Sequence, residues 1–171
     1  MSSVQSFPPI VGDGSRVLIL GSMPGRASLL AGQYYAHSRN AFWPLMEALL
    51  GIDCALPYAR RCDALGAAGI ALWDVLQSCT RSGSLDSAIV ESSIVSNDFA
   101  ALLRQRRTIA GIFFNGAMAE RSFKRYVLPD LGAAAATLPR IRLPSTSPAH
   151  ASLTFQQKLE QWRQILPLLR S

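Results

Sequence analysis

Four short and largely apolar runs recur along the chain, and each is followed by glycine, proline or a polar residue. These runs lie at 17–20, 69–73, 109–114 and 138–143. A continuous apolar run of this length is typical of a strand buried on both faces of a parallel sheet. The sequence therefore predicts four mostly parallel strands.

Helical patterns separate and follow these runs. They lie at 41–51, 58–68, 96–106, 116–127 and 153–168. In the last segment, one stripe at helical spacing collects Leu159, Trp162, Ile165, Leu166 and Leu169. Thr154 followed by Gln157 has the spacing of a capping box at the start of that helix. The pattern predicts an amphipathic C-terminal helix.

Strands that alternate with helices indicate an α/β protein. We predict a three-layer α/β/α sandwich with a mostly parallel four-stranded sheet, formed by one domain over 1–171 with an irregular lead-in at 1–15. In such folds, ligands bind outside the carboxyl ends of the strands. Four junctions should meet there, at 21–43, 74–86, 115–117 and 143–152.

Charge is distributed unevenly along the chain. Residues 1–95 carry 6 Lys/Arg against 7 Asp/Glu, whereas residues 96–171 carry 11 against 4. The second part therefore has a net charge of +7 within a total of +6 for the chain. Lysine and arginine gain affinity for phosphates by displacing counterions, so this asymmetry suits a polyanionic partner.

Composition excludes several other classes of protein. Hydrophobic residues make up 49% of the chain and charged residues 16%, which indicates a globular protein. No apolar run approaches the roughly 20 residues of a membrane-spanning helix, and the start lacks the features of a secretory signal. The three cysteines contain no C-x-x-C, so we expect reduced thiols, no metal and no cofactor. A cytoplasmic monomer is the expectation.

Two junctions hold most of the unusual polar residues. The first reads GSMPGRASL at 21–29 and QYYAHSRNAFW at 33–43, and it contains neither a Walker A loop nor G-x-G-x-x-G. A Gly-Pro turn after a buried strand can point several backbone N–H groups at one acceptor. The last junction reads LPSTSPAHA at 143–151 and is rich in hydroxyl groups.

These three motifs, in this order, resemble the uracil-DNA glycosylase superfamily, and their particular forms look most like its deoxyinosine (hypoxanthine-DNA) glycosylase branch. The resemblance covers about residues 10–168. It implies a four-stranded parallel sheet between helices and a target nucleotide that is flipped out of the duplex. Breaking the N-glycosidic bond then requires donors at the departing base and a residue that places water at C1′.

The resemblance also implies roles for residues of the first junction. Met23 falls where better-known branches carry the Asn or Asp that places water, and methionine can neither orient nor deprotonate water. We expect Asn40 to take over as the catalytic residue, although Asn40 could instead cap the helix that begins near Ala41. Ser22 and Met23 are expected to lie against the base, and Gly25 against DNA.

Other candidates concern the base. Tyr35 matches the position at which the family stacks an aromatic ring on the extruded base, with ordinary packing as the alternative. Asp74 follows the second strand, where its carboxylate could accept from hypoxanthine N1–H or uracil N3–H, or cap the next segment. Asn115 follows the third strand and either binds the base or caps a helix. Phe42 and Trp43 are expected in the core.

The last loop has candidates for DNA binding. Ser145 and Ser147 match positions that hold DNA phosphates, and Ser147 stands where relatives carry the residue that wedges into the duplex. The alternative for both is a turn at the start of a helix. Leu143 replaces a His or Asn that stabilises the leaving base in other branches. His150, and with less support His37, could contact a phosphate or the leaving base, or have no role.

We interpret the chain as a metal-free, monofunctional DNA N-glycosylase of base excision repair, acting on DNA that contains deaminated bases. Water is the expected nucleophile, because no motif holds a lysine that could form a Schiff base. The two lysines, Lys124 and Lys158, stand on predicted helices away from the strand ends. Hypoxanthine is the first expected substrate. The alternatives are a uracil- or G:U/T mismatch-specific glycosylase and a catalytically silent protein that binds damaged DNA.

Overall fold

The computed structural model describes residues 2–170, and a four-stranded sheet forms its centre. The order across the sheet is β3-β2-β6-β7, and every neighbouring pair is parallel. The strands are β2 (Val17–Gly21), β3 (Ile70–Asp74), β6 (Gly111–Asn115) and β7 (Arg140–Leu143). These are the four strands that the apolar runs predict, so this prediction is confirmed.

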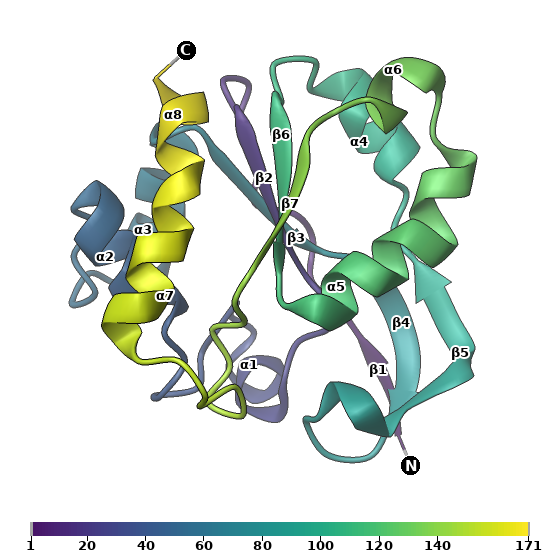
Figure 1. Cartoon of the computed structure of the whole chain (residues 1–171). Helices are drawn as coiled ribbons and strands as arrows, with labels where there is room; N and C mark the ends of the chain where they lie inside the picture. The colour runs from purple at the N-terminus through teal and green to yellow at the C-terminus, as the bar shows by residue number, and fades with distance from the viewer. Residues whose placement is uncertain (1, 171) are drawn as a thin grey trace.

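Helices cover both faces of this sheet (Figure 1). One face carries α2 (Phe42–Leu50), α3 (Tyr58–Ala67), α7 (Phe155–Trp162) and α8 (Leu166–Leu169), with η4 (Arg163–Ile165) joining the last two. The other face carries α4 (Phe99–Gln105), α5 (Ala117–Ser122) with η2 (Phe123–Val127) and η3 (Leu128–Asp130), and α6 (Ala133–Ala136). The short α1 (Arg26–Ala31) follows β2 directly. The three-layer α/β/α sandwich is therefore confirmed.

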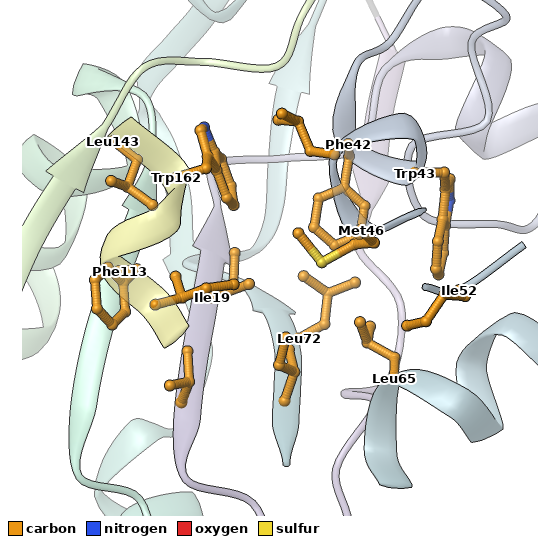
Figure 2. Packing of buried hydrophobic residues seen from close by; sticks show 14 of the residues in the cluster. Ile19, Phe42, Trp43, Met46, Ile52, Leu65, Leu72, Phe113, Leu143 and Trp162 are labelled. Carbon is orange, nitrogen blue, oxygen red and sulfur yellow. The ribbon is translucent and has the colours of Figure 1, made fainter. Parts of the chain in front are cut away.

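Alternate residues of the buried strands face opposite helical layers. In β2, Val17 and Ile19 join one core cluster, and Leu18 and Leu20 join the other. Figure 2 shows the first cluster, in which Ile19 lies among side chains that include Phe42 and Trp162. Because every residue of β2 is buried, the strand needs apolar side chains on both faces, which explains its continuous apolar run.

The C-terminal helical segment begins with the predicted capping box, but it is not one continuous α-helix, because η4 separates α7 from α8. Thr154 accepts from the backbone N–H of Gln157, and the Gln157 side chain accepts from the N–H of Thr154, which completes the capping box. Trp162 is fully buried and its indole N–H donates to the Pro144 carbonyl at 3.0 Å. The helix is thereby fastened to the loop that follows β7.

A second sheet was not predicted. Three antiparallel strands pair in the order β1-β4-β5: β1 (Ser2–Gln5), β4 (Leu76–Arg81) and β5 (Ile89–Ser96). The expected irregular lead-in at 1–15 is thus wrong at its start, and the junction at 74–86 contains a strand. Exposed polar residues in β1 hide its strand character, because pairing with β4 rather than burial of apolar side chains makes it a strand.

Among the described residues, no helix is long and apolar enough to cross a membrane, and no group of three or more His, Cys, Asp or Glu could hold a metal ion. Cys54, Cys62 and Cys79 are free thiols.

Candidate functional site

A cavity of about 400 Å³ opens at the carboxyl ends of the parallel strands. All four predicted junctions line it, with the turn at 21–28, the hairpin tip at 84–87 and the loop at 145–150 forming most of its wall. Every candidate site residue named from the sequence also lines it: Ser22, Met23, Gly25, Tyr35, Asn40, Asp74, Asn115, Ser145, Ser147 and His150. A volume of this size is ordinary for a small-molecule or nucleotide pocket.

The deep end of the cavity is built on Gly21, the last residue of β2. A Cβ atom at this position would lie 2.5 Å from Asp74 Oδ1 and 2.9 Å from the Tyr35 hydroxyl oxygen. Glycine is therefore required by space, since any side chain would displace both groups. The carboxyl of Asp74 and the hydroxyl of Tyr35 thus gather over one backbone position.

Asp74 is a buried carboxyl with unused hydrogen-bonding capacity. Asp74 is 3% exposed, and its Oδ2 atom has no hydrogen-bond partner among the described residues. Burial and, to a smaller extent, the nearby Asp86 raise the pKa of Asp74 to about 7 against the opposing charge of Arg81. No helix begins after Asp74, because β4 starts at Leu76, so the capping interpretation of Asp74 is wrong.

Tyr35 is held in an unusual backbone conformation. It is the one non-glycine residue with positive φ in the described chain, at 56°. Such a conformation is costly for a residue with a Cβ, so the fold must hold it in place. The Tyr35 ring packs on Phe42 at a centroid distance of 4.3 Å, and its hydroxyl is buried without a hydrogen-bond partner. Burial raises the pKa of this hydroxyl, which stays a proton donor.

Asn40 combines a local contact with a place on the cavity wall. Its Oδ1 atom accepts from the backbone N–H of Phe42, the first residue of α2, at 2.9 Å. This contact satisfies a free N–H of the first helical turn, although Ala41 rather than Asn40 is the N-cap residue of α2. The same hydrogen bond orients the amide group, and the amide nitrogen makes no hydrogen bond among the described residues. The two interpretations of Asn40 are therefore compatible.

The turn after β2 is tied to the tip of the β4–β5 hairpin. Ser22 Oγ donates to Asp86 Oδ1 at 2.7 Å, and the backbone N–H of Arg26 donates to Ser84 Oγ at 2.8 Å. Met23 is 8% exposed and belongs partly to the core, as well as to the cavity wall. Gly25 directly precedes α1. The hairpin tip, including η1 (Asp86–Ala88), thus closes one side of the cavity.

Asn115 links β6 to the last loop. Its Nδ2 donates to Thr146 Oγ1, and its Oδ1 accepts from the Thr146 backbone N–H, both at 2.9 Å. The side chain makes no capping bond to α5, which follows Gly116, so the capping interpretation is wrong. Because this pair joins residues 31 apart in sequence, Asn115 fixes the position of the loop beside the cavity.

The last loop is a series of serine turns. Ser145 Oγ accepts from the N–H of Ser147, and Ser147 Oγ accepts from the N–H of Ala149. These bonds match the turn alternative, and they leave both hydroxyl protons available to an acceptor. The carbonyl of His150 accepts from Lys158 Nζ at 2.8 Å, and burial lowers the pKa of Lys158. Lys158 lies on the C-terminal helix, as predicted. Its side chain reaches this loop at the strand ends through the bond to His150, but it does not line the cavity.

The remaining candidates have plain structural roles. Phe42 and Trp43 are buried in the core as expected. Leu143 also belongs to the core, so position 143 offers no polar group to the cavity. His37 lines the cavity, and its Nδ1 accepts from the backbone N–H of Arg39. No local pattern marks Ser84, Asp86 or Thr146 as site residues, because their roles depend on partners far along the chain.

The site offers a planar ring two kinds of contact. Tyr35 presents an aromatic surface and a hydroxyl donor, while Asp74 presents an acceptor when it is ionised. Asn40 can orient a water molecule through its amide, and the hydroxyl groups of the serine turns can bind an anion at the cavity wall. Together these groups suit an extruded nucleotide whose base enters the deep end and whose phosphates stay at the rim.

Comparisons with known proteins identify the family. The model of the uracil DNA glycosylase superfamily matches residues 8–170. A hypoxanthine DNA glycosylase of Methanosarcina barkeri (strain Fusaro / DSM 804) is 37% identical over 113 residues, which cover 66% of this chain and 70% of the relative. A hypoxanthine DNA glycosylase of Methanosarcina acetivorans is 34% identical over 116 residues, covering 67% and 72%.

A solved structure is similar over nearly the whole chain. It is a solution NMR structure of a Methanosarcina acetivorans protein described as a candidate uracil DNA glycosylase, with a TM-score of 0.81 and 28% sequence identity. The match covers 99% of this chain and 100% of that one. The similarity therefore includes the sheet, both helical layers and the cavity end of the fold.

Proposed function

Because the chain belongs to the uracil DNA glycosylase superfamily, we propose that it is a monofunctional DNA N-glycosylase that removes hypoxanthine from DNA in base excision repair. The relatives named hypoxanthine DNA glycosylase support this substrate. The observation that carries the proposal is the cavity itself, which gathers the residues of all three sequence motifs around an unpartnered buried acceptor at Asp74.

The base enters the deep end of the cavity in this proposal. Its ring lies against Tyr35, where stacking contributes roughly 1–3 kcal/mol. Its N1–H donates to the Asp74 carboxylate, which otherwise has an unpaired oxygen atom. A buried acceptor without a hydrogen-bond partner destabilises the free protein, so the hydrogen bond from the base N–H offsets that penalty and favours binding. Ser22 and Met23 form the wall beside the base.

Water then attacks the sugar. Asn40 orients the water molecule at C1′, the bond between C1′ and N9 breaks, and its electron pair leaves with the base. The water oxygen becomes the C1′ hydroxyl, and the proton that it loses balances the one that the departing base gains. Met23 contributes no polar atom to this step. Leu143 likewise leaves the base without the polar partner that other branches supply, so the unpartnered hydroxyl of Tyr35 carries that role.

A covalent enzyme intermediate is not part of the proposal. Neither lysine of the chain lines the cavity, and the buried ammonium of Lys158 already donates to a backbone carbonyl. The reaction therefore ends at an abasic site with an intact strand.

The DNA backbone binds around the rim. Gly25, Ser145, Ser147 and His150 are the proposed contacts, because they line the cavity and are partly exposed, whereas Asp74 is buried. The excess of Lys and Arg in residues 96–171 adds a long-range attraction for phosphates. We further propose that the protein acts as a monomer, since one chain supplies every residue of the cavity.

Uracil is the second candidate substrate. Its N3–H offers the same donor to Asp74 as hypoxanthine N1–H, and the similar NMR structure is described in terms of uracil. A smaller pyrimidine would lose part of the contact with Tyr35, which favours the purine.

A panel of duplexes tests the proposal. Oligonucleotides that contain inosine, uracil, a thymine mismatch or xanthine are incubated with the protein, and alkaline cleavage reports abasic sites. The expected result is fastest release from the inosine duplex, with no cleavage before alkali. Faster release of uracil would transfer the function to the second candidate. Binding without release of any base would support a catalytically silent protein.

A further inference from the structure

Arg81 is a buried cation without an ion-pair partner. It ends β4, is 1% exposed, and ranks among the largest fully buried side chains of the described chain. Its Nη2 donates to the Pro24 carbonyl, but its Nε and Nη1 have no hydrogen-bond partner among the described residues. No described carboxylate lies within 4.0 Å of it as an ion pair. Burying an unpaired guanidinium costs free energy, which indicates that Arg81 has a role in the neighbouring site.

The charged groups nearest to Arg81 belong to the cavity. Arg81 lowers the pKa of both Asp74 and Asp86 through space. Asp86 has a fixed partner in Ser22, whereas Asp74 Oδ2 has none. The charged groups that act on Asp74 come from two elements, Asp86 on the hairpin tip and Arg81 on β4. Asp74 in turn raises the pKa of the buried hydroxyls of Tyr34 and Tyr35.

We propose that Arg81 is a positioning residue that determines base specificity: its buried guanidinium holds the turn after β2 and keeps Asp74 a hydrogen-bond acceptor. The inference rests on the proposed function, in which Asp74 meets the edge of the extruded base. Arg81 touches neither the base nor the reacting atoms. It acts through its buried charge, which lowers the pKa of Asp74, and through its bond to Pro24, which lines the cavity.

The consequence is discrimination between hypoxanthine and adenine. Hypoxanthine presents an N1–H donor, whereas adenine presents a lone pair at N1. An ionised carboxylate accepts from the first and repels the second, but a protonated carboxyl can donate to adenine N1. A normal base would then be bound in the site. With Asp74 buried and Asp86 nearby, only the charge of Arg81 opposes that protonation.

The pH dependence has a definite sign. Burial raises the pKa of Asp74 to about 7, so the acceptor form dominates only above that pH. The preference for inosine over adenosine should therefore rise as the pH increases through 7. Loss of the positive charge at position 81 raises the pKa of Asp74 and moves this rise to higher pH.

The test uses binding rather than turnover. Duplexes that contain 2′-fluorinated deoxyinosine or 2′-fluorinated deoxyadenosine, whose glycosidic bonds resist hydrolysis, are titrated with the full chain from pH 5.5 to 8.5. Wild type is compared with Arg81→Met and Arg81→Lys. Arg104→Met is the matched control, because Arg104 is exposed on α4 and does not line the cavity.

The expected result is a preference for inosine at pH 7.5 that falls about tenfold in Arg81→Met, which corresponds to a change of one pKa unit at Asp74. Arg81→Lys should keep most of the preference because it keeps the charge, and Arg104→Met should behave as wild type. An unchanged midpoint and preference in a folded Arg81→Met protein would overturn the inference.

A second measurement covers the case in which Arg81→Met folds poorly. The carboxyl carbon of Asp74 is titrated by ¹³C NMR in the free wild-type and Arg81→Lys proteins, without DNA. The expected result is a midpoint near 7 in both proteins. An ordinary carboxyl midpoint near 4, or a midpoint that rises in the lysine variant although the charge is kept, contradicts the inference. Failure to release hypoxanthine would refute the proposed function instead, since neither of these readouts depends on turnover.

Discussion

Replacing Asn40 by alanine separates the two roles of this side chain. The substitution removes the hydrogen bond from Phe42 N–H to Asn40 Oδ1, 2.9 Å long, at the start of α2. It also removes the amide from the cavity wall. The first loss acts on stability and the second on the chemical step, so one variant reports both if stability and rate are measured on the same preparation.

The two losses differ greatly in size. An N-terminal side-chain acceptor of a helix contributes about 1 kcal/mol, which is equivalent to a melting-temperature decrease of roughly 2–4 °C in a domain of this length. A group that stabilises the transition state contributes about 2.7–4 kcal/mol, or 10²–10³ in rate. With a total stability of about 5–15 kcal/mol, losing about 1 kcal/mol leaves nearly all molecules folded. Reduced stability alone therefore cannot lower the rate a hundredfold.

The assay is single-turnover release of hypoxanthine from an inosine duplex, beside thermal unfolding. Asp53→Ala is a matched control, because Asp53 Oδ1 accepts from the N–H of Ala55 at 2.8 Å in the same i to i+2 arrangement, away from the cavity. Asn40→Ala should lose 10²–10³ in rate with little change in DNA affinity, since the contact is made mainly in the transition state. A fully active but less stable Asn40→Ala protein would refute the catalytic assignment.

Three further predictions follow from other parts of the molecule. Met23→Ala should keep the chemical step largely intact while it lowers the free energy of unfolding, because Met23 is mostly buried and offers no polar atom; a hundredfold rate loss would contradict this. DNA affinity should fall steeply between 50 and 200 mM salt, as filter binding or anisotropy can measure, and a flat dependence would exclude the charge argument. In denaturant titrations, the free energy of unfolding of Asp74→Asn minus that of wild type should increase as pH rises from 5 to 8. The raised pKa of Asp74 favours folding only while the carboxyl is protonated, and that contribution is lost as pH rises through about 7; a constant difference would refute it.

The central sheet could be predicted because its strands are buried on both faces. Every residue of β2 is buried, so each position along 17–20 needs an apolar side chain and the sequence shows a continuous apolar run. The carboxyl-end rule then located the cavity, since parallel strands bring their following loops to one edge. The candidate residues from three separate motifs accordingly line the same cavity.

The second sheet and the support of the site could not be predicted in the same way. β1 consists of Ser-Ser-Val-Gln and is mostly exposed, so only its pairing with β4 makes it a strand. Arg81 looks like a surface residue in sequence, because nothing local indicates that its strand will bury the guanidinium. The Asn115–Thr146 and Ser22–Asp86 contacts join residues 31 and 64 apart, and such pairs carry no local pattern.

The same limit applies to the chemistry of individual side chains. Asn40 carried two interpretations in sequence that the structure shows to be compatible, because one oxygen atom serves the helix while the amide remains at the cavity. For Asp74, the sequence could name the acceptor but not its pKa, which depends on burial and on the opposing charges of Asp86 and Arg81.

Quantification of free hypoxanthine is the most direct test of the proposed function. An excess of protein is mixed with an inosine duplex, and chromatography with mass detection measures the released base while a borohydride trap in parallel reports any protein–DNA adduct. A monofunctional glycosylase should release one hypoxanthine per duplex and form an equal number of abasic sites, with intact strands and no trapped adduct. Absence of free hypoxanthine, or a strand broken through a trapped lysine adduct, would contradict it.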